Sequence, residues 1–390
     1  MTGTAPYRIA LVAGEPSGDA LGAALMPALR ERAPGPVEFL GVAGPQMCAE
    51  GMASLFAMSD LTLMGLAEVV PSIPKVLRRL RQTARAIEAW QPDAVVTIDA
   101  PDFCFRLAKR LHGRAGPLIH YVAPTVWAWR PGRARRIAGR FDHLLTLLPF
   151  EPPYFEREGL AATFVGHPVA LPIGLPPGGA ASRARHGIAA EAPVLCVLPG
   201  SRSGELRRLL PLFGEAVGRL AGRFPGLRIV IPTLPTIADR VAAAAAAWPG
   251  APVVVGQAEK ANAFAAATAA LAASGTVSLE LALAGVPQVI AYKMSRLTAM
   301  VGRMVIRVRW ASLVNILAND TVVPELIQGD CTADRMVDAV APLLADPAAR
   351  AEQTRRSAES VAKLHGPGGN ASRAAADVVF GLIEARPRRA

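Results

Sequence analysis

The chain has 390 residues, of which 52% are hydrophobic and 19% charged, so it has room for roughly two to three domains and is not intrinsically disordered. Its 42 Lys and Arg outnumber its 31 Asp and Glu, and the formal charge of +11 indicates an anionic partner: nucleic acid, an acidic lipid surface or a phosphorylated substrate. The four cysteines lie far apart without metal-ligand spacing, as expected of free thiols in a reducing cytoplasm. We expect neither a signal peptide nor a membrane-spanning helix, because no uncharged apolar stretch reaches about 18 residues.

The first half of the chain predicts buried parallel strands, most of them followed by a helix or a glycine-rich turn. The predicted strands are 7–13, 37–42, 93–99, 118–122, 143–148 and 162–165. The loop Gly14-Glu15-Pro16-Ser17-Gly18-Asp19 follows the first strand, but it lacks the third glycine of a dinucleotide fingerprint and the lysine of a P-loop. Taken alone, it is more typical of a strand–helix turn capped by Ser17 or Asp19 than of a binding site.

Residues 73–90 form a basic amphipathic segment with apolar side chains at roughly helical spacing. The favoured interpretation is a helix that packs its apolar face on a core and leaves its basic face in solvent. The alternative is a helix that lies on a membrane surface. A second basic run, 130–140, follows Trp127 and Trp129, but no nucleic-acid recognition signature accompanies it.

Asp99 ends the predicted strand 93–99, and Pro101 prevents a helix from continuing back through the turn that follows. The carboxyl ends of parallel strands are where an open sheet binds ligands, so Asp99 is a candidate base. A lone Asp in this position is as often a helix cap, and Asp102 is the better candidate for the cap of the next helix.

Residues 170–193 are rich in Pro, Gly and Ala and predict an interdomain linker. The alternation of strand and helix then restarts, with strands predicted at 194–198, 227–232, 252–255, 269–273 and 288–293. Both halves therefore favour the α/β class, with parallel sheets covered by helices.

The turn Ser274-Gly275-Thr276 lies between a predicted strand and a predicted helix of the second half. Backbone N–H groups at such a turn favour a phosphate, and Arg202 places a guanidinium near the same sheet edge. Glu280 lies four positions after Thr276, where a carboxylate suits the hydroxyls of a ribose. The alternative is a solvated helix glutamate beside an ordinary Ser N-cap, and spacing alone leaves the two interpretations open.

Nine short fragments occur in an informative order: AGEPSGDALGA (13–23), MGLAEV (64–69), IDAPDF (98–103), HYVAPTVWAWR (120–130), PFE (149–151), FVGHP (164–168), LPGSR (198–202), SGTVSLE (274–280) and VPELIQ (323–328). Together they resemble the lipid-A-disaccharide synthase family of GT-B glycosyltransferases, over about residues 7–328. The chain departs from the family pattern at Cys104, Ala123 and Val314, where Asn, Ser and Pro are usual.

The resemblance implies a GT-B architecture of two Rossmann-like domains, with parallel sheets that face a cleft, and C-terminal helices. It implies an acceptor-binding and membrane-facing domain at 1–169 and, after the linker 170–193, a UDP-sugar-binding domain at 194–345. The C-terminal helices are expected at 346–390.

The resemblance also implies a reaction, in which UDP-2,3-diacylglucosamine donates its sugar to 2,3-diacylglucosamine 1-phosphate (lipid X) in lipid A biosynthesis. Asp99 is then the catalytic base. The residues expected to bind UDP are Arg202, Ser274, Gly275, Thr276, Glu280, Asn315 and Gln328, and those expected to bind the acceptor are Glu15, Ser17, Asp19 and Glu68. No cofactor is implied, and no metal, because the chain has no Asp-x-Asp pair.

Because both substrates are acylated, we expect a peripheral protein on the cytoplasmic face of the inner membrane, without a nucleic-acid partner. The resemblance leaves a homodimer open. Two alternative functions also stay open: another GT-B enzyme acting on a UDP-sugar, as a transferase or an epimerase, and a basic RNA-binding protein.

Overall fold

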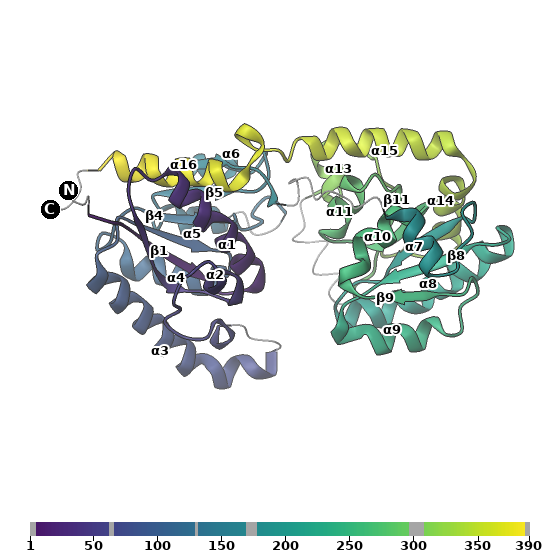
Figure 1. The fold of residues 1–390 in the computed structure, drawn as a ribbon, viewed down its shortest axis with the longest axis horizontal. Helices are drawn as coiled ribbons and strands as arrows, with labels where there is room; N and C mark the ends of the chain where they lie inside the picture. Colours follow the sequence, from purple (N-terminus) through teal and green to yellow (C-terminus); the bar gives the residue numbers. More distant parts are fainter. Residues whose placement is uncertain (1–4, 62–65, 129–131, 169–177, 296–307, 387–390) are drawn as a thin grey trace. The chain divides into compact units, whose positions relative to one another are not determined.

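The computed structural model describes residues 5–61, 66–128, 132–168, 178–295 and 308–386. By its internal contacts the chain divides into two compact units, one of residues 1–171 with 364–390 and the other of residues 172–363. Each unit has its own sheet and its own apolar core, and both are of the α/β class that the sequence predicts (Figure 1).

The first unit is built on a six-stranded parallel sheet in the order β2-β1-β3-β4-β5-β6. Its strands are β1 (Tyr7–Ala13), β2 (Val37–Val42), β3 (Ala94–Ile98), β4 (Leu118–Tyr121), β5 (His143–Thr146) and β6 (Ala162–Phe164). These bounds confirm the predicted strands to within two residues at each end. The central strands are unbroken apolar runs because helices bury both faces of the sheet.

Helices cover both faces of this sheet. They are α1 (Pro16–Arg32), α2 (Pro45–Ala49), α3 (Leu66–Trp90), α4 (Pro101–Leu111), α5 (Gly132–Ala138), α6 (Pro152–Glu156) and α16 (Ala371–Glu384). Successive side chains of a strand point to opposite faces. Thus Ile9 and Leu11 of β1 pack in one core with α1, α2 and α16, whereas Ala10 and Val12 pack in the other with α3, α4 and α5.

Helix α3 begins earlier than predicted, at Leu66, and its second half is anchored in a core. Leu80 is 2% exposed and Ile87 is fully buried, and both pack in one cluster with Leu107 of α4. The core-facing interpretation of this basic segment is therefore confirmed. Among the described residues, no helix combines the length and apolar character needed to cross a bilayer.

Two glycines of the first unit allow its two chain segments to touch. A Cβ atom on Gly166 would lie 2.6 Å from the backbone nitrogen of Gly366, and a Cβ atom on Gly366 would lie 2.0 Å from the carbonyl oxygen of Val165. Gly166 also has φ = 102°, which side chains rarely adopt. Next to this crossing the amide of His167 donates to the carbonyl of Leu364, so the chain rejoins the first unit through backbone contact before α16.

The second unit repeats the plan with a six-stranded parallel sheet in the order β12-β11-β10-β7-β8-β9. Its strands are β7 (Val194–Leu198), β8 (Arg228–Pro232), β9 (Val253–Val255), β10 (Ala269–Ala273), β11 (Gln288–Tyr292) and β12 (Glu325–Ile327). Its helices are α7 (Gly179–Arg185), α8 (Ser203–Arg223), α9 (Ala238–Ala245), α10 (Lys260–Ala266), α11 (Val277–Leu283), α13 (Leu313–Ala318), α14 (Ala333–Ala345) and α15 (Pro347–Ala362). The sequence does not predict the short strand β12.

The first part of the expected linker, up to residue 177, lies outside the described residues. Arg183 of α7 holds the second part in place. The Arg183 guanidinium donates to the carbonyls of Ala192 and Ala266, each at 2.7 Å, which attaches this segment to the second unit. The C-terminal helices divide between the units, because α15 packs with α11 and α13 whereas α16 packs on α1.

Candidate active site

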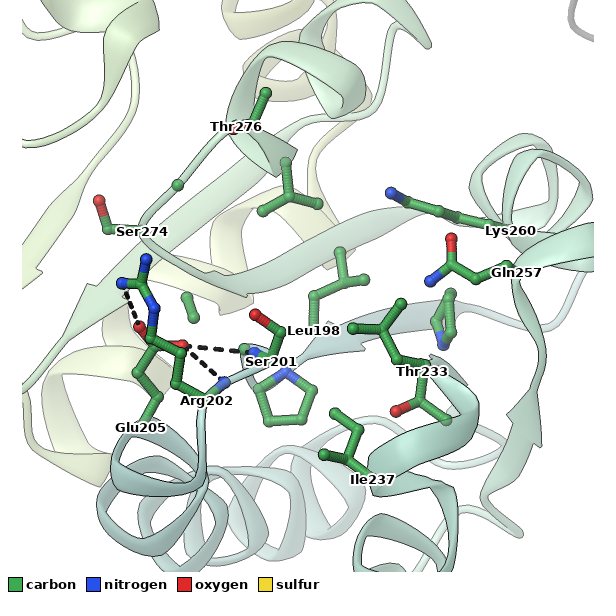
Figure 2. Close-up of a pocket in the computed structure, with 17 residues that line it drawn as sticks. Leu198, Ser201, Arg202, Glu205, Thr233, Ile237, Gln257, Lys260, Ser274 and Thr276 are labelled. Carbon is green, nitrogen blue, oxygen red and sulfur yellow. Dashed lines mark hydrogen bonds and ion pairs between the residues drawn. The ribbon is translucent and has the colours of Figure 1, made fainter. Parts of the chain in front are cut away.

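A pocket of about 360 Å³ lies at the carboxyl edge of the sheet in the second unit (Figure 2). Strands β10, β7 and β8 are neighbours in this sheet, so the segments that follow them meet at one edge. These segments supply most of the lining: residues 199–202 after β7, 233–234 after β8 and 274–277 after β10. The structure therefore brings together Arg202 and the turn Ser274–Thr276, as the sequence predicts.

Arg202 and Glu205 form one wall of the pocket at the start of α8. The Glu205 carboxylate accepts from the backbone N–H groups of Ser201 and Arg202, both at 3.3 Å. The other Glu205 oxygen lies 3.4 Å from the Arg202 guanidinium, whose side chain is 81% exposed. The cationic group is thus loosely held at the surface of the pocket, and the helix start is oriented by its own carboxylate (Figure 2).

Ser274 is not the N-cap of α11. The N-cap position is Thr276, without a side-chain hydrogen bond, and the Ser274 hydroxyl donates to the carbonyl of Ala311 at 3.3 Å. The alternative interpretation of this turn as an ordinary Ser N-cap is therefore wrong.

Glu280 pairs with a lysine that sequence reasoning missed. The ammonium of Lys260 forms an ion pair with Glu280, and the two side chains are only 22% and 30% exposed. Lys260 lines the pocket, and Glu280 is not among the lining residues. Its carboxylate is paired and only partly exposed, so Glu280 is not a solvated helix residue.

Gln257 and Thr233 also line the pocket and were missed. Thr233 directly follows β8, and Gln257 lies two residues beyond β9. Residues that follow the carboxyl ends of parallel strands are candidates for ligand binding, which is why Arg202 and Ser274 were predicted. The same reasoning applied to the ends of β8 and β9 would have indicated Thr233 and Gln257.

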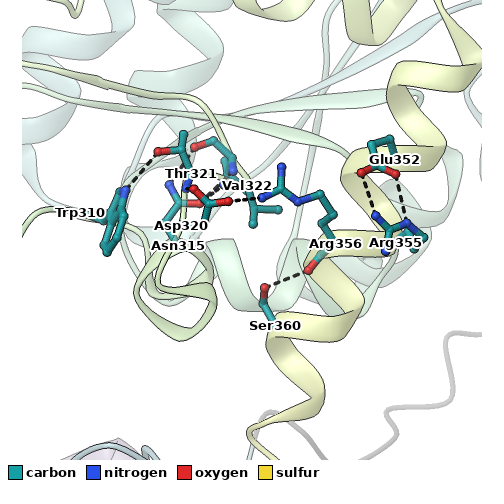
Figure 3. A network of polar contacts seen from close by, with 10 residues as sticks. Trp310, Asn315, Asp320, Thr321, Val322, Glu352, Arg355, Arg356 and Ser360 are labelled. Atoms are coloured by element: carbon teal, nitrogen blue, oxygen red, sulfur yellow. Dashed lines mark hydrogen bonds and ion pairs between the residues drawn. The ribbon is translucent and has the colours of Figure 1, made fainter.

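Asn315, predicted to bind UDP, has all its hydrogen-bonding capacity used within the protein. Figure 3 shows it beside Val322, one of its partners. Its side-chain oxygen accepts from the amides of Val322 and Val323, and its nitrogen donates to Val323 and Glu325, all at 2.8 Å. A buried amide with two donors and two acceptor sites so occupied has none left for a ligand. Asn315 instead holds the loop that leads into β12, and we correct its assignment to a structural one.

Gln328 follows β12 with φ = 56° and is not part of the pocket lining. Its side-chain oxygen accepts from the amide of Met294 at 3.3 Å. Its contribution to UDP binding stays a prediction.

In the first unit, Asp99 lies at the carboxyl edge of β3 in a strained turn. Asp99 and Ala100 both have left-handed backbone conformations, with φ of 51° and 43°. One Asp99 oxygen accepts from the Ser17 hydroxyl at 2.7 Å and the other from the Ala100 amide at 2.9 Å. The loop 14–18 packs closely here, because a Cβ atom on Gly14 would lie 2.6 Å from that of Ala100. The structure therefore joins Ser17 to Asp99, and retained backbone strain of this kind is typical of functional sites.

Glu15 belongs to the same edge. Partial burial, and then the charges of Asp99 and Asp102, raise the pKa of the Glu15 carboxyl. The three carboxyl groups thus lie close enough to interact, and the edge has an acidic character.

Asp102 is not the helix cap that the sequence predicts. The N-cap position of α4 is Ala100, without a side-chain hydrogen bond, and the Asp102 side chain is 98% exposed. The guanidinium of Arg133 lies 3.7 Å from its carboxylate.

Asp19 and Glu68 complete the expected acceptor site. Asp19 is 1% exposed, and its two oxygens accept from the backbone amides of Gly44, Gln46 and Met47 at the start of α2. Because both oxygens are occupied in the interior, we correct its assignment to a cap of α2. Glu68 lies in α3, but its side chain is outside the described part of the structure.

Trp127 and Glu151 form a partly buried pair in the first unit that sequence reasoning missed. The Trp127 indole N–H donates to Glu151 at 3.1 Å, and the amide of Leu148 donates to the other Glu151 oxygen at 3.1 Å. Glu151 is 3% exposed, and burial raises its pKa to about 7 against the opposing effect of these hydrogen bonds.

No group of three or more His, Cys, Asp or Glu side chains in the described part of the chain is arranged to hold a metal ion.

Two such α/β units and a pocket at a sheet edge define the GT-B class of fold. The structure aligns with MurG of Acinetobacter baumannii with a TM-score of 0.60 and 15% identity, over 97% of this chain and all of that one. It also aligns with a putative UDP-N-acetylglucosamine 2-epimerase from Listeria monocytogenes, with a TM-score of 0.66 and 14% identity over 98% of each chain. At these identities the likeness establishes the fold alone.

The chain belongs to the lipid-A-disaccharide synthetase family, whose model matches residues 9–379. It is 56% identical to the lipid-A-disaccharide synthase of Rhodospirillum centenum, over 98% of this chain and 96% of the relative. It is 49% identical to that of Paramagnetospirillum magneticum, over 96% and 97%. The protein is therefore a glycosyltransferase of lipid A biosynthesis, and the resemblance found in the sequence is confirmed.

Proposed function

We propose that this enzyme transfers 2,3-diacylglucosamine from its UDP derivative to the 6-hydroxyl of 2,3-diacylglucosamine 1-phosphate. The products are a β-1,6-linked tetraacyl disaccharide 1-phosphate and UDP. The observation that carries the proposal is the pocket of the second unit, where Arg202 and Lys260 lie with Ser274–Thr276 at one sheet edge. Two cations and a turn of backbone N–H groups are complementary to a nucleoside diphosphate.

The diphosphate binds between Arg202 and the turn Ser274–Thr276 in this proposal. Arg202 is exposed and has only a 3.4 Å contact with Glu205, so its guanidinium can turn to the phosphates at little cost. Glu280 accepts hydrogen bonds from the ribose hydroxyls, with Lys260 holding its carboxylate at the side of the pocket. Gln328 remains a further contact in this proposal.

Asp99 acts as the general base. It takes the proton of the acceptor 6-hydroxyl while that oxygen forms its bond to the anomeric carbon and the bond from that carbon to UDP breaks. Ser17 and the Ala100 amide fix the orientation of the Asp99 carboxylate. Glu15 and Glu68 contact the acceptor. The charge that develops on UDP is stabilised by Arg202 and Lys260, since fixed cations favour a transition state in which negative charge accumulates.

We also propose that the protein works as a peripheral protein at the cytoplasmic face of the inner membrane, because both substrates carry acyl chains.

The test is to incubate the purified protein with both substrates dispersed in detergent and to follow disaccharide by mass spectrometry and UDP by chromatography. We expect the two products in equal amounts and only when both substrates are present. Conversion of the UDP-sugar without an acceptor would instead support an epimerase and contradict the proposal.

A further inference from the structure

Arg133 of α5 brings a positive charge to the acidic edge of the first unit, by which we mean Glu15, Asp99 and Asp102. Its guanidinium lies 3.7 Å from the carboxylate of Asp102, which stands in the first turn of α4, three residues after Asp99. The electrostatic effect of Asp99 and Asp102 on Glu15 shows that the three carboxyl groups are neighbours. Among the residues that the structure describes, no other Lys or Arg forms an ion pair with any of the three.

The Arg133 side chain is held by an aromatic ring, whereas its ion pair is weak. The guanidinium carbon lies 5.3 Å from the centre of the Phe105 ring, and Phe105 is buried in the core of the first unit. A cation over an aromatic face is stabilised without using its hydrogen-bond donors in the plane of the guanidinium. The 3.7 Å contact with Asp102 is longer than a hydrogen bond, and the Asp102 side chain is 98% exposed. The cost of exchanging Asp102 for another anion is therefore small.

The acidic edge is by itself a poor place for the proposed acceptor, because that sugar carries a phosphate. The 6-hydroxyl must reach Asp99 for its proton to be taken. In a pyranose, the carbon that bears the phosphate and the carbon that bears the 6-hydroxymethyl group both flank the ring oxygen. The phosphate therefore lies within one sugar ring of Asp99, where neighbouring carboxylates repel it. A cation beside the same carboxylates offsets this repulsion, and Arg133 is in that position.

We propose that Arg133 binds the 1-phosphate of the acceptor and makes the enzyme selective for a phosphorylated acceptor. This rests on the proposed function, in which the first unit holds the acceptor and Asp99 is the base. The planar guanidinium presents parallel N–H groups that match two phosphate oxygens. The phosphate replaces Asp102 as the partner of Arg133, and the exposed Asp102 carboxylate returns to solvent. Arg133 thus determines specificity, while Asp99 remains the catalytic residue.

The test compares two acceptors with the full-length enzyme: 2,3-diacylglucosamine 1-phosphate and the same sugar without its phosphate, both dispersed in detergent. The quantity measured is the ratio of kcat/KM for the first acceptor to that for the second. Arg133→Met removes the charge and keeps an unbranched side chain against Phe105. It should lower the ratio at least about tenfold, the effect of losing a hydrogen bond between charged groups. The loss should appear as a higher KM for the phosphorylated acceptor, with the KM for the UDP-sugar unchanged.

Arg135→Met is the matched control, at an exposed position of the same helix, and should keep the ratio of the unaltered enzyme. Arg133→Lys retains a point charge and should keep part of the selectivity. A partly unfolded variant would lower both rates equally and leave the ratio unchanged, so the ratio reports phosphate recognition even if Arg133→Met is less stable.

An unchanged ratio in Arg133→Met would overturn the proposal, as would a ratio that falls in Arg135→Met instead. The same holds if the unaltered enzyme shows no preference for the phosphorylated acceptor. These results differ from failure of the proposed function, in which the unaltered protein forms no disaccharide from either acceptor. In that case the assignment of Arg133 fails with it.

Discussion

The two units have the same kind of sheet but opposite charge at its carboxyl edge. Beyond β7 and β10, Arg202 and Lys260 line a pocket, each near a carboxylate. Beyond β1 and β3 the edge instead holds carboxyl groups, and partial burial, followed by the charges of Asp99 and Asp102, raises the pKa of Glu15. The comparison teaches that the sheet supplies only the position, whereas the few residues after each strand determine the chemistry. In the proposed reaction the cationic edge binds the leaving group and the acidic edge takes the proton.

Asp99→Asn, a change at the acidic edge, should have the largest effect on activity. The amide keeps the shape of the side chain but cannot take the proton, so kcat should fall at least about 10²-fold. UDP affinity and melting temperature should change little, because the proposed UDP pocket lies in the other unit. Steady-state kinetics, calorimetry with UDP and thermal unfolding measure the three quantities.

Asp102→Asn is the matched control for Asp99→Asn, because Asp102 is 98% exposed and caps no helix. It should keep both turnover and stability. An inactive Asp102→Asn beside an active Asp99→Asn would transfer the role of base to Asp102.

Glu151→Gln tests a carboxyl group of the first unit that lies away from the sheet edge. The quantity tested is its contribution to folding stability at different pH. The pKa of Glu151 is raised in the folded protein from 4.5 to about 7, so its neutral form is favoured by folding. The stability that this group contributes is therefore present at acid pH and is lost as the pH rises from about 4.5 through 7. The loss should amount to roughly 3.5 kcal/mol, at about 1.4 kcal/mol for each pH unit between the two pKa values.

Urea denaturation of the unaltered protein and of Glu151→Gln across this pH range isolates the contribution of Glu151 as a difference. Glu156→Gln, at an exposed position of α6, is the control and should follow the unaltered protein. If the difference between Glu151→Gln and the unaltered protein does not vary with pH, the buried carboxyl does not titrate as described.

Arg202→Ala should weaken UDP binding at the cationic edge. Loss of a hydrogen bond to a charged group should reduce UDP affinity by about 1.5–3 kcal/mol, or roughly 10- to 150-fold. Arg207→Ala, at an exposed position one turn further along α8 and outside the pocket lining, should leave the affinity unchanged. Isothermal calorimetry distinguishes them, and equal affinities for both variants would remove Arg202 from the site.

Chelation of divalent ions should have the smallest effect. Because Arg202 and Lys260 supply positive charge at the pocket, turnover in EDTA should match turnover without it. Loss of activity in EDTA that Mg²⁺ restores would show that these side chains do not suffice for the leaving group.

The sequence by itself determined the α/β class, most strands and the residues that end them. Those features are local: an apolar run between glycine or proline turns specifies a buried strand, and the next residues must then lie at the edge of the sheet. For this reason the amino-acid pattern alone places Asp99, Arg202 and the turn Ser274–Thr276 at sheet edges, where the fold has them.

Only the tertiary structure decided which polar side chains remain available to a ligand. Asp19 and Asn315 looked like site residues, but their hydrogen-bonding atoms are occupied by the backbone of α2 and of the loop before β12. Glu280 pairs with Lys260, which lies twenty residues earlier in the chain. Sequence spacing could not reveal these pairings, because the partner of a polar group depends on which distant segments the folded cores bring into contact.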